Sequence, residues 1–233
     1  MFDQIALTAL LAGFATVFII IYLKRRASSS RRGYLRESYF DDCQPLFSHG
    51  TKAIAATGFP RISGHHEGIG FDLQAVPDTL TFRKLPTLWL LVTIPEPMPV
   101  RSRFDMMLRP MGVETFSNYR TLPVQIVPPA GFPEDCEIRC DDPAGLPPDS
   151  LLMRHLAPFR DGRAKELVIS PKGVRIVWLA EEADRGQYLL FRNAELGMTP
   201  LDPAVLQPLL DYLIRLRNDL IATAAEENKE TTS

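Results

Sequence analysis

Cysteine is scarce in this sequence, with only Cys43, Cys136 and Cys140 among 233 residues. An odd, sparse set does not suit a disulfide scaffold and fits a reducing compartment. Cys136 and Cys140 do not have a zinc-knuckle spacing, and no second pair of cysteines follows them. If residues 136–140 form a strand, the two thiols share a face but lie more than about 12 Å apart, too far for a disulfide.

The sequence also lacks the short motifs of several enzyme classes. It contains no Gly-x-Ser-x-Gly elbow and no Ser-x-x-Lys motif, which are typical of serine hydrolases and β-lactamases. The glycines between Gly64 and Gly70 do not have the spacing of a phosphate-binding loop, and strands are expected on both sides of them. Whether the chain is an enzyme stays open, and we favour a non-catalytic protein.

Clustered positive charge is absent from most of the chain. Of its 26 Lys and Arg and 28 Asp and Glu, 21 basic and 27 acidic residues remain once Asp3 and the five basic residues at 24–32 are subtracted. A nucleic-acid surface needs clustered basic side chains to neutralise phosphates. We therefore expect no nucleic-acid partner.

One long hydrophobic run is present, at residues 5–23, which read IALTALLAGFATVFIIIYL without a charged side chain. Nineteen helical residues rise about 28 Å, close to the hydrocarbon thickness of about 30 Å. A cleaved signal peptide would have basic residues before this run, whereas Asp3 precedes it and Lys24 follows it. We expect residues 1–23 to be a retained transmembrane anchor.

Five basic residues follow this run directly: Lys24, Arg25, Arg26, Arg31 and Arg32. Because positively charged flanks stay on the cytoplasmic side, we expect a single-pass inner-membrane protein with its N-terminus outside and its C-terminal domain in the cytoplasm. Residues 24–33 would be a basic juxtamembrane tether. The same side chains can also bind anionic lipid headgroups, at about 1 kcal/mol each, and both roles can hold at once.

Alternating apolar residues predict antiparallel strands from residue 59 onward. Residues 61–75 have the pattern of a hairpin with glycines at its turn. We expect a turn at Pro77-Asp78 and a further strand at 79–83. The continuous apolar run from Leu88 to Val92 predicts a central strand that is covered on both faces.

Proline limits the middle of the chain, since twelve of the twenty prolines fall between Pro86 and Pro148. Proline removes a backbone donor and fixes φ, which excludes long helices here. Strands are expected at 103–109 and 135–140. Two arrangements stay open: a boundary between sub-lobes near 122–134, or one irregular sheet.

The C-terminal third returns to regular patterns. We expect Asp149-Ser150 to cap a short helix that carries His155 as a packed core residue, followed by strands at 167–169, 174–178 and 188–191 in an antiparallel meander. Asp202-Pro203 has the preferred order for a helix start. The helix that follows has an apolar stripe at helical spacing: Leu206, Leu209, Leu210, Leu213, Leu216, Leu220 and Ile221.

These patterns together predict an α+β fold. It comprises an N-terminal single transmembrane helix and a mostly antiparallel β-sheet domain at 34–225 with a C-terminal packing helix. The polar residues 226–233 are expected to be a disordered tail.

A polar cluster in the first hairpin is the best candidate for chemistry: His65, His66, Glu67 and Asp72. Two histidines beside a carboxylate can ligate a metal, with Asp72 or His49 completing the site. Neighbours in a strand point to opposite faces, however, so His65 and His66 converge only in a tight turn. We expect a polar hairpin tip with no metal and no other cofactor. Arg83-Lys84 and Lys165-Glu166 are expected to be solvated charges at strand ends.

We therefore predict a membrane-anchored, non-catalytic protein whose cytoplasmic domain binds a partner, as an accessory or scaffold component of a membrane complex. The expected partners are the lipid bilayer and a membrane protein, because confinement to one membrane raises their effective concentration. The sequence does not decide the oligomeric state.

Two alternatives stay open. An enzyme acting on a lipid or membrane-bound substrate would require the polar cluster to converge within about 3–4 Å of one reactive point. A small-ligand sensor would require a large apolar pocket with a few polar groups facing inward.

Overall fold

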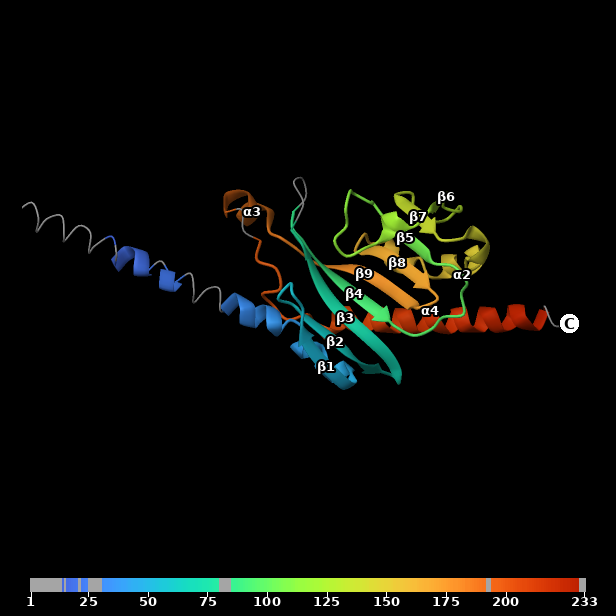
Figure 1. Ribbon diagram of the computed structural model, residues 1–233, viewed down its shortest axis with the longest axis horizontal. Coiled ribbons are helices and arrows are strands. Elements are labelled where there is room, and N and C mark those ends of the chain that lie inside the picture. The colour runs from blue at the N-terminus through green and yellow to red at the C-terminus, as the bar shows by residue number, and fades with distance from the viewer. Residues whose placement is uncertain are drawn as a thin grey trace, which may run out of the picture.

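The structure, a computed structural model, describes residues 14, 16–20, 22–24, 31–79, 85–191 and 194–230. In these residues nine strands form one sheet (Figure 1). The strands are β1 (Ser48–Ile54), β2 (Pro60–His66), β3 (Ile69–Asp78), β4 (Thr87–Ile94), β5 (Phe104–Leu108), β6 (Val124–Ile126), β7 (Cys136–Cys140), β8 (Ala164–Ser170) and β9 (Gly173–Glu182).

The described helices are fewer and mostly short. Residues 31–37 are helical. The named elements are the 3-10 turns η1 (Asp41–Leu46), η2 (Tyr119–Thr121), η3 (Pro143–Gly145) and η4 (Ala157–Phe159), and the α-helices α2 (Asp149–Arg154), α3 (Arg185–Phe191) and α4 (Pro203–Glu230).

The strand order is β1-β2-β3-β4-β9-β8-β5-β7-β6, and neighbouring strands pair antiparallel throughout. The predicted antiparallel sheet is confirmed, as are its first hairpin and its central strand. β4 lies between β3 and β9, and its side chains from Leu88 to Val92 are buried on both faces. The β8–β9 hairpin lies between β4 and β5, so strands far apart in sequence become neighbours.

The two faces of the sheet bury different clusters. Leu90, Met106 and Ile176 belong to the main core, to which α4 contributes its leucines. The smaller cluster, on the opposite face, contains Trp89, Met107, Phe116, Tyr119 and Val177. Its non-sheet members come from the segment 110–122, which therefore covers that face over β4, β9 and β5.

Helix α4 starts as its sequence predicts. Asp202 Oδ1 accepts a hydrogen bond from the Ala204 amide at 2.8 Å, and Pro203 occupies the first helical position, where its missing N–H costs nothing. The leucine stripe packs into the main core. The helix continues to Glu230, which includes residues of the expected tail, and Figure 1 shows its C-terminal part extending past the sheet.

The transmembrane helix is the main correction to the predicted fold class. Residues 14, 16–20 and 22–24 have helical backbone, and the rest of the predicted anchor 1–23 lies outside the described residues. Within the described ranges no helix is long and apolar enough to cross a bilayer. The inner-membrane location and its orientation stay predictions of the sequence.

Three local predictions of secondary structure are also wrong. Pro77 and Asp78 do not turn; they are the last residues of β3 and pair with Leu88 and Thr87. The pairing of β3 with β2 ends at Gln74, which lies opposite Arg61. Beyond that point no β2 carbonyl needs an amide donor from β3, so proline is tolerated at position 77. The predicted strand 79–83 falls almost entirely outside the described residues.

The expected third strand of the meander, at 188–191, is part of helix α3. A short apolar run such as Tyr-Leu-Leu-Phe does not distinguish a strand from a helix. At α2 the helix begins at Asp149 itself, and its N-cap Pro148 makes no side-chain hydrogen bond, so the predicted Asp149-Ser150 cap is also wrong.

Candidate functional site

The structure does not bring the predicted polar cluster to one point. His65 and Asp72 lie on the sheet face opposite the main core, because His65 pairs with Gly70 and Ser63 pairs with Asp72. His66 lies on the other face. Glu67 occupies the turn between β2 and β3 with φ of 51°, and its side chain is exposed.

Two members of the cluster, His66 and Asp72, instead make local structural contacts. The carbonyl of Leu46 lies 2.8 Å from His66 Nδ1, which must carry the proton to donate to it. Asp72 accepts hydrogen bonds from Arg61 Nε at 2.6 Å and Ser63 Oγ at 3.0 Å. The described residues contain no group of three or more His, Cys, Asp or Glu arranged to hold a metal ion. The enzyme hypothesis thus loses the residues on which it rested.

The basic residues after the hydrophobic run are only partly described. Lys24 and Arg31 are exposed on helical backbone, whereas Arg25 and Arg26 lie outside the described residues. Arg32 Nη1 lies 3.9 Å from Glu195 Oε1, so it contacts the domain. Nothing in this geometry tests their predicted contact with lipid headgroups.

One register row of mostly polar residues crosses the face opposite the main core, with one residue from each strand. The register links run without a break along the sheet. From β1 to β6 in sheet order the row is Thr51, Ser63, Asp72, Thr93, Arg175, Val168, Asp105, Arg139 and Gln125. Because it crosses the inserted β9–β8 hairpin, this row is a product of strand order and is invisible in the sequence.

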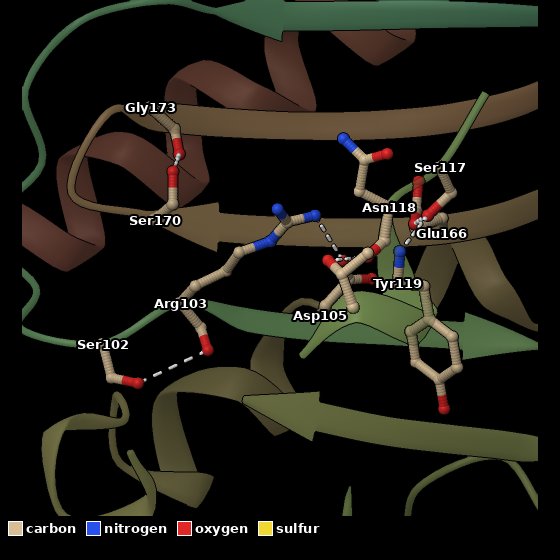
Figure 2. A network of polar contacts seen from close by, with 10 residues as sticks. Ser102, Arg103, Asp105, Ser117, Asn118, Tyr119, Glu166, Ser170 and Gly173 are labelled. Atoms are coloured by element: carbon tan, nitrogen blue, oxygen red, sulfur yellow. Dashed lines mark hydrogen bonds and ion pairs between the residues drawn. The ribbon is translucent and has the colours of Figure 1, made fainter. Parts of the chain in front are cut away.

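One member of this row, Asp105 on β5, belongs to a buried pair of carboxyl groups with Glu166 on the neighbouring strand β8 (Figure 2). Their exposed fractions are 0% and 1%. Arg103 points toward Asp105, with Nη2 2.7 Å from Oδ2, and Ser117 donates its hydroxyl to Glu166. The Tyr119 amide then donates to Ser117 Oγ at 3.0 Å. We call these five residues the buried polar network.

Burial sets the electrostatics of this network. It raises the pKa of Glu166 well above its ordinary value, and the neighbouring Asp105 charge raises it further. Burial also raises the pKa of Asp105, against the opposing pull of the Arg103 guanidinium. The arrangement therefore favours a neutral Glu166 beside an Asp105 that has its own counter-charge.

Paired carboxyl groups with different protonation are a device of acid–base catalysis. Here both side chains are closed to solvent, so a substrate cannot reach them in this conformation. The hydrogen bond from Ser117 to Glu166 instead attaches the segment 110–122 to the sheet. Lys165 reinforces this attachment, because its Nζ lies 3.1 Å from Glu114 Oε1 and donates to the Arg109 carbonyl at 2.7 Å.

Sequence reasoning missed this network. Lys165 and Glu166 are buried, which contradicts the prediction that they are solvated strand-end charges. β8 lies between β9 and β5 and is not an edge, and a register shift between Ala164 and Glu166 breaks the alternation there. Asp105 did carry a signal, because it is a lone carboxylate in the otherwise apolar strand FDMML.

The edge strand β1 is the most accessible regular element of the sheet. It ends the strand order in the part of the chain that the structure describes, and all seven of its residues are exposed. The Ala55 amide donates to the Phe59 carbonyl at 2.9 Å where β1 turns into β2. Backbone groups alternate in direction along an antiparallel strand, so Ala53 faces β2, whereas Lys52 and Ile54 direct their amides and carbonyls outward.

In comparisons with known proteins, the chain matches no protein-family model and no curated protein.

Proposed function

We propose that this domain is a non-catalytic protein-binding module that adds an extended segment of a partner protein to the β1 edge. Exposed edges present unpaired amides and carbonyls, and strand addition satisfies them with main-chain hydrogen bonds. The single observation that carries the proposal is the full exposure of the seven-residue strand β1 at the end of the sheet.

The contrast between the two edges supports a use for β1. At the other edge, β6 has only three residues, and Pro123 and Pro128 stand close on either side of it. Short strands and prolines are common protections against edge pairing. β1 is longer and contains no proline.

Lys52 is the charge that would protect β1, and it is engaged elsewhere. Its Nζ lies 2.5 Å from Asp41 Oδ1 on η1, and this ion pair neutralises the Lys52 charge. The stretch Thr51–Ile54 pairs regularly with Ser63–Pro60 after an irregularity beyond Ser48. A regular, charge-neutral edge of this kind suits an added strand.

Proline substitutions test the edge directly, because Ile54 opposes Pro60 and its amide faces outward. A photo-crosslinking residue at the exposed Ala53 in the native host is expected to yield one discrete adduct with a partner protein. Adding Ile54→Pro should abolish that adduct while leaving the thermal midpoint within a few degrees. Lys52→Pro is the second outward-facing variant. Ala53→Pro, whose amide faces β2, should lower the midpoint instead.

A crosslinker at Gln125 on β6 serves as the matched control and should give no such adduct. Three results would contradict the proposal: no adduct at Ala53, an adduct that survives both outward-facing prolines in a folded protein, or an adduct of twice the chain's mass. The last would assign the edge to a second copy of this chain.

The proposal requires no membrane attachment, and the partner's membership of a membrane complex stays a prediction of the sequence. A second candidate function, a small-ligand sensor, is favoured by one specific observation: a cleft beneath helix α4.

A further inference from the structure

A cleft lies between the C-terminal end of α2 and the middle of α4, with a volume of about 700 Å³. We define this α2–α4 cleft by Arg154, Pro158, Trp178, Tyr212, Arg215 and Asp219. Small-molecule sites in proteins are about 300–1,000 Å³ and combine apolar walls with a few placed polar groups. The α2–α4 cleft has this size and this composition.

The apolar part of the cleft includes Trp178 of β9 and Leu209 of α4. Trp178 is only partly buried, yet its indole Nε1 is buried and has no hydrogen-bond partner among the described residues. Buried donors without partners are uncommon in proteins. The indole therefore offers the cleft a flat apolar surface, while its donor is closed to solvent.

Positive charge dominates the polar part of the cleft. Arg154 on α2 and Arg215 on α4 both line it and both are exposed. Among the described residues that line the cleft the one carboxylate is Asp219, which lies 3.0 Å from His155 Nε2 and 3.9 Å from Arg154 Nη1. Asp219 is thus already engaged by the protein.

His155 does not add to this charge at neutral pH. Burial lowers its pKa, the Asp219 carboxylate opposes that shift, and Arg154 and Arg215 reinforce it. A neutral His155 donates through Nε2 to Asp219. Tyr212 donates its hydroxyl to the His155 carbonyl at 3.0 Å, so this pair forms a fixed wall of the cleft.

We propose that the α2–α4 cleft binds an organic anion that has an aromatic or alkyl body. The body packs against Trp178, Pro158 and Leu209, and the anionic head lies between Arg215 and Arg154. Two guanidinium groups against one engaged carboxylate select an anion over a cation. This site lies away from β1, and the inference goes beyond strand addition at that edge.

Calorimetric titration of the full chain with 2-naphthoate tests the proposal, with 2-naphthamide as the neutral match. Saturable 1:1 binding with Kd below about 1 mM is expected, a level within reach of a ligand of this size. The amide should bind at least tenfold more weakly. Decanoate against decanol repeats the comparison for an alkyl body.

Substitutions locate the site. Arg215→Ala should weaken 2-naphthoate binding about tenfold and Arg215→Glu should abolish it, while Lys172→Glu makes the same charge change at the exposed β8–β9 turn and should leave Kd within twofold. Trp178→Leu removes the flat ring against which the body packs and should weaken binding about threefold. Circular dichroism confirms that each variant is folded.

Three results would overturn the proposal. They are the absence of saturable binding by both anions, equal affinity for the anion and its neutral match, and an Arg215→Glu variant that is folded and binds as wild type does. None of them bears on crosslinking at β1, so failure here is distinguishable from failure of the proposed function.

Discussion

Replacement of Glu166 by Gln isolates the electrostatics of the buried polar network. Glu166 is 1% exposed, accepts the Ser117 hydroxyl and lies beside Asp105, and both effects of burial and charge raise its pKa. Glutamine has the same shape and cannot ionise. Its amide oxygen can accept from Ser117, and its amide nitrogen can donate to the Asp105 carboxylate, so the attachment of segment 110–122 is retained.

The sign of the effect follows from proton linkage. Because the pKa of Glu166 is higher in the folded protein than its value of about 4.3 in the unfolded chain, the folded state binds the proton more tightly. This stabilisation is complete below pH of about 4 and decreases as the pH rises toward the folded pKa. The decrease is about 1.4 kcal/mol per pH unit for one proton. Asp105 acts in the same direction, since its pKa is also raised.

The Glu166→Gln variant therefore loses this proton's share of the pH dependence. We expect the free energy of unfolding of the variant to decrease less steeply with pH than that of wild type, by up to about 1.4 kcal/mol per pH unit. At pH 8 the variant should therefore be more stable than wild type. Urea denaturation at pH 5, 6, 7 and 8 measures this through Trp89, which packs on Phe116 of the covering segment at 5.1 Å. Glu182→Gln, at an exposed position, is the control and should follow wild type.

Two outcomes would refute this reasoning. An unchanged pH slope in Glu166→Gln would mean that the carboxyl group is ionised in both states or in neither. A variant less stable than wild type at pH 8 would mean that the ionised carboxylate is favoured in the network. Either result would reassign the charge of the pair formed by Asp105 and Glu166.

Two further predictions concern the backbone and the thiols. A Cβ at Gly173, where φ is 143°, would lie 2.2 Å from the Ile94 carbonyl oxygen, so Gly173→Ala should cost at least about 2 kcal/mol in urea unfolding, whereas Gly58→Ala, with φ of 80° in open space, should cost about 1 kcal/mol. The three cysteines are buried, and burial raises the pKa of Cys43 to about 12 and that of Cys136 to about 11. Ellman's reagent at pH 8 should therefore label them only as fast as the protein unfolds, and rapid labelling in folded protein would contradict the packing.

The sequence predicted those elements whose side-chain pattern and packing agree. Leu88–Val92 is apolar on both faces because β4 is central, and Asp202-Pro203 starts α4 because its chemistry is local to the helix end. It did not predict β1, since a strand exposed at all seven positions carries no alternation to detect. The three residues of β6 are too few to show a pattern.

The buried polar network could not be assembled from sequence for a topological reason. Asp105 and Glu166 are 61 positions apart in the chain, and they meet because the β8–β9 hairpin lies between β4 and β5. A lone carboxylate within an apolar strand is a usable signal for a buried charge. The partner of that charge depends on strand order, which alternation alone does not specify.

The same topology separates the proposed activities from the stabilising charges. The buried polar network lies on the interior strands β5 and β8, under the segment 110–122. Strand β1 lies at the end of the sheet, five positions from β8 in the strand order. The α2–α4 cleft opens toward helix α4, where Trp178 belongs to the main-core side of β9. A substitution that changes the charge of Glu166 should therefore alter stability without altering crosslinking at Ala53 or the affinity for 2-naphthoate. If the variant lost crosslinking or 2-naphthoate binding while it stayed folded, the network would control the edge or the cleft. That result would contradict the structural separation of the three sites.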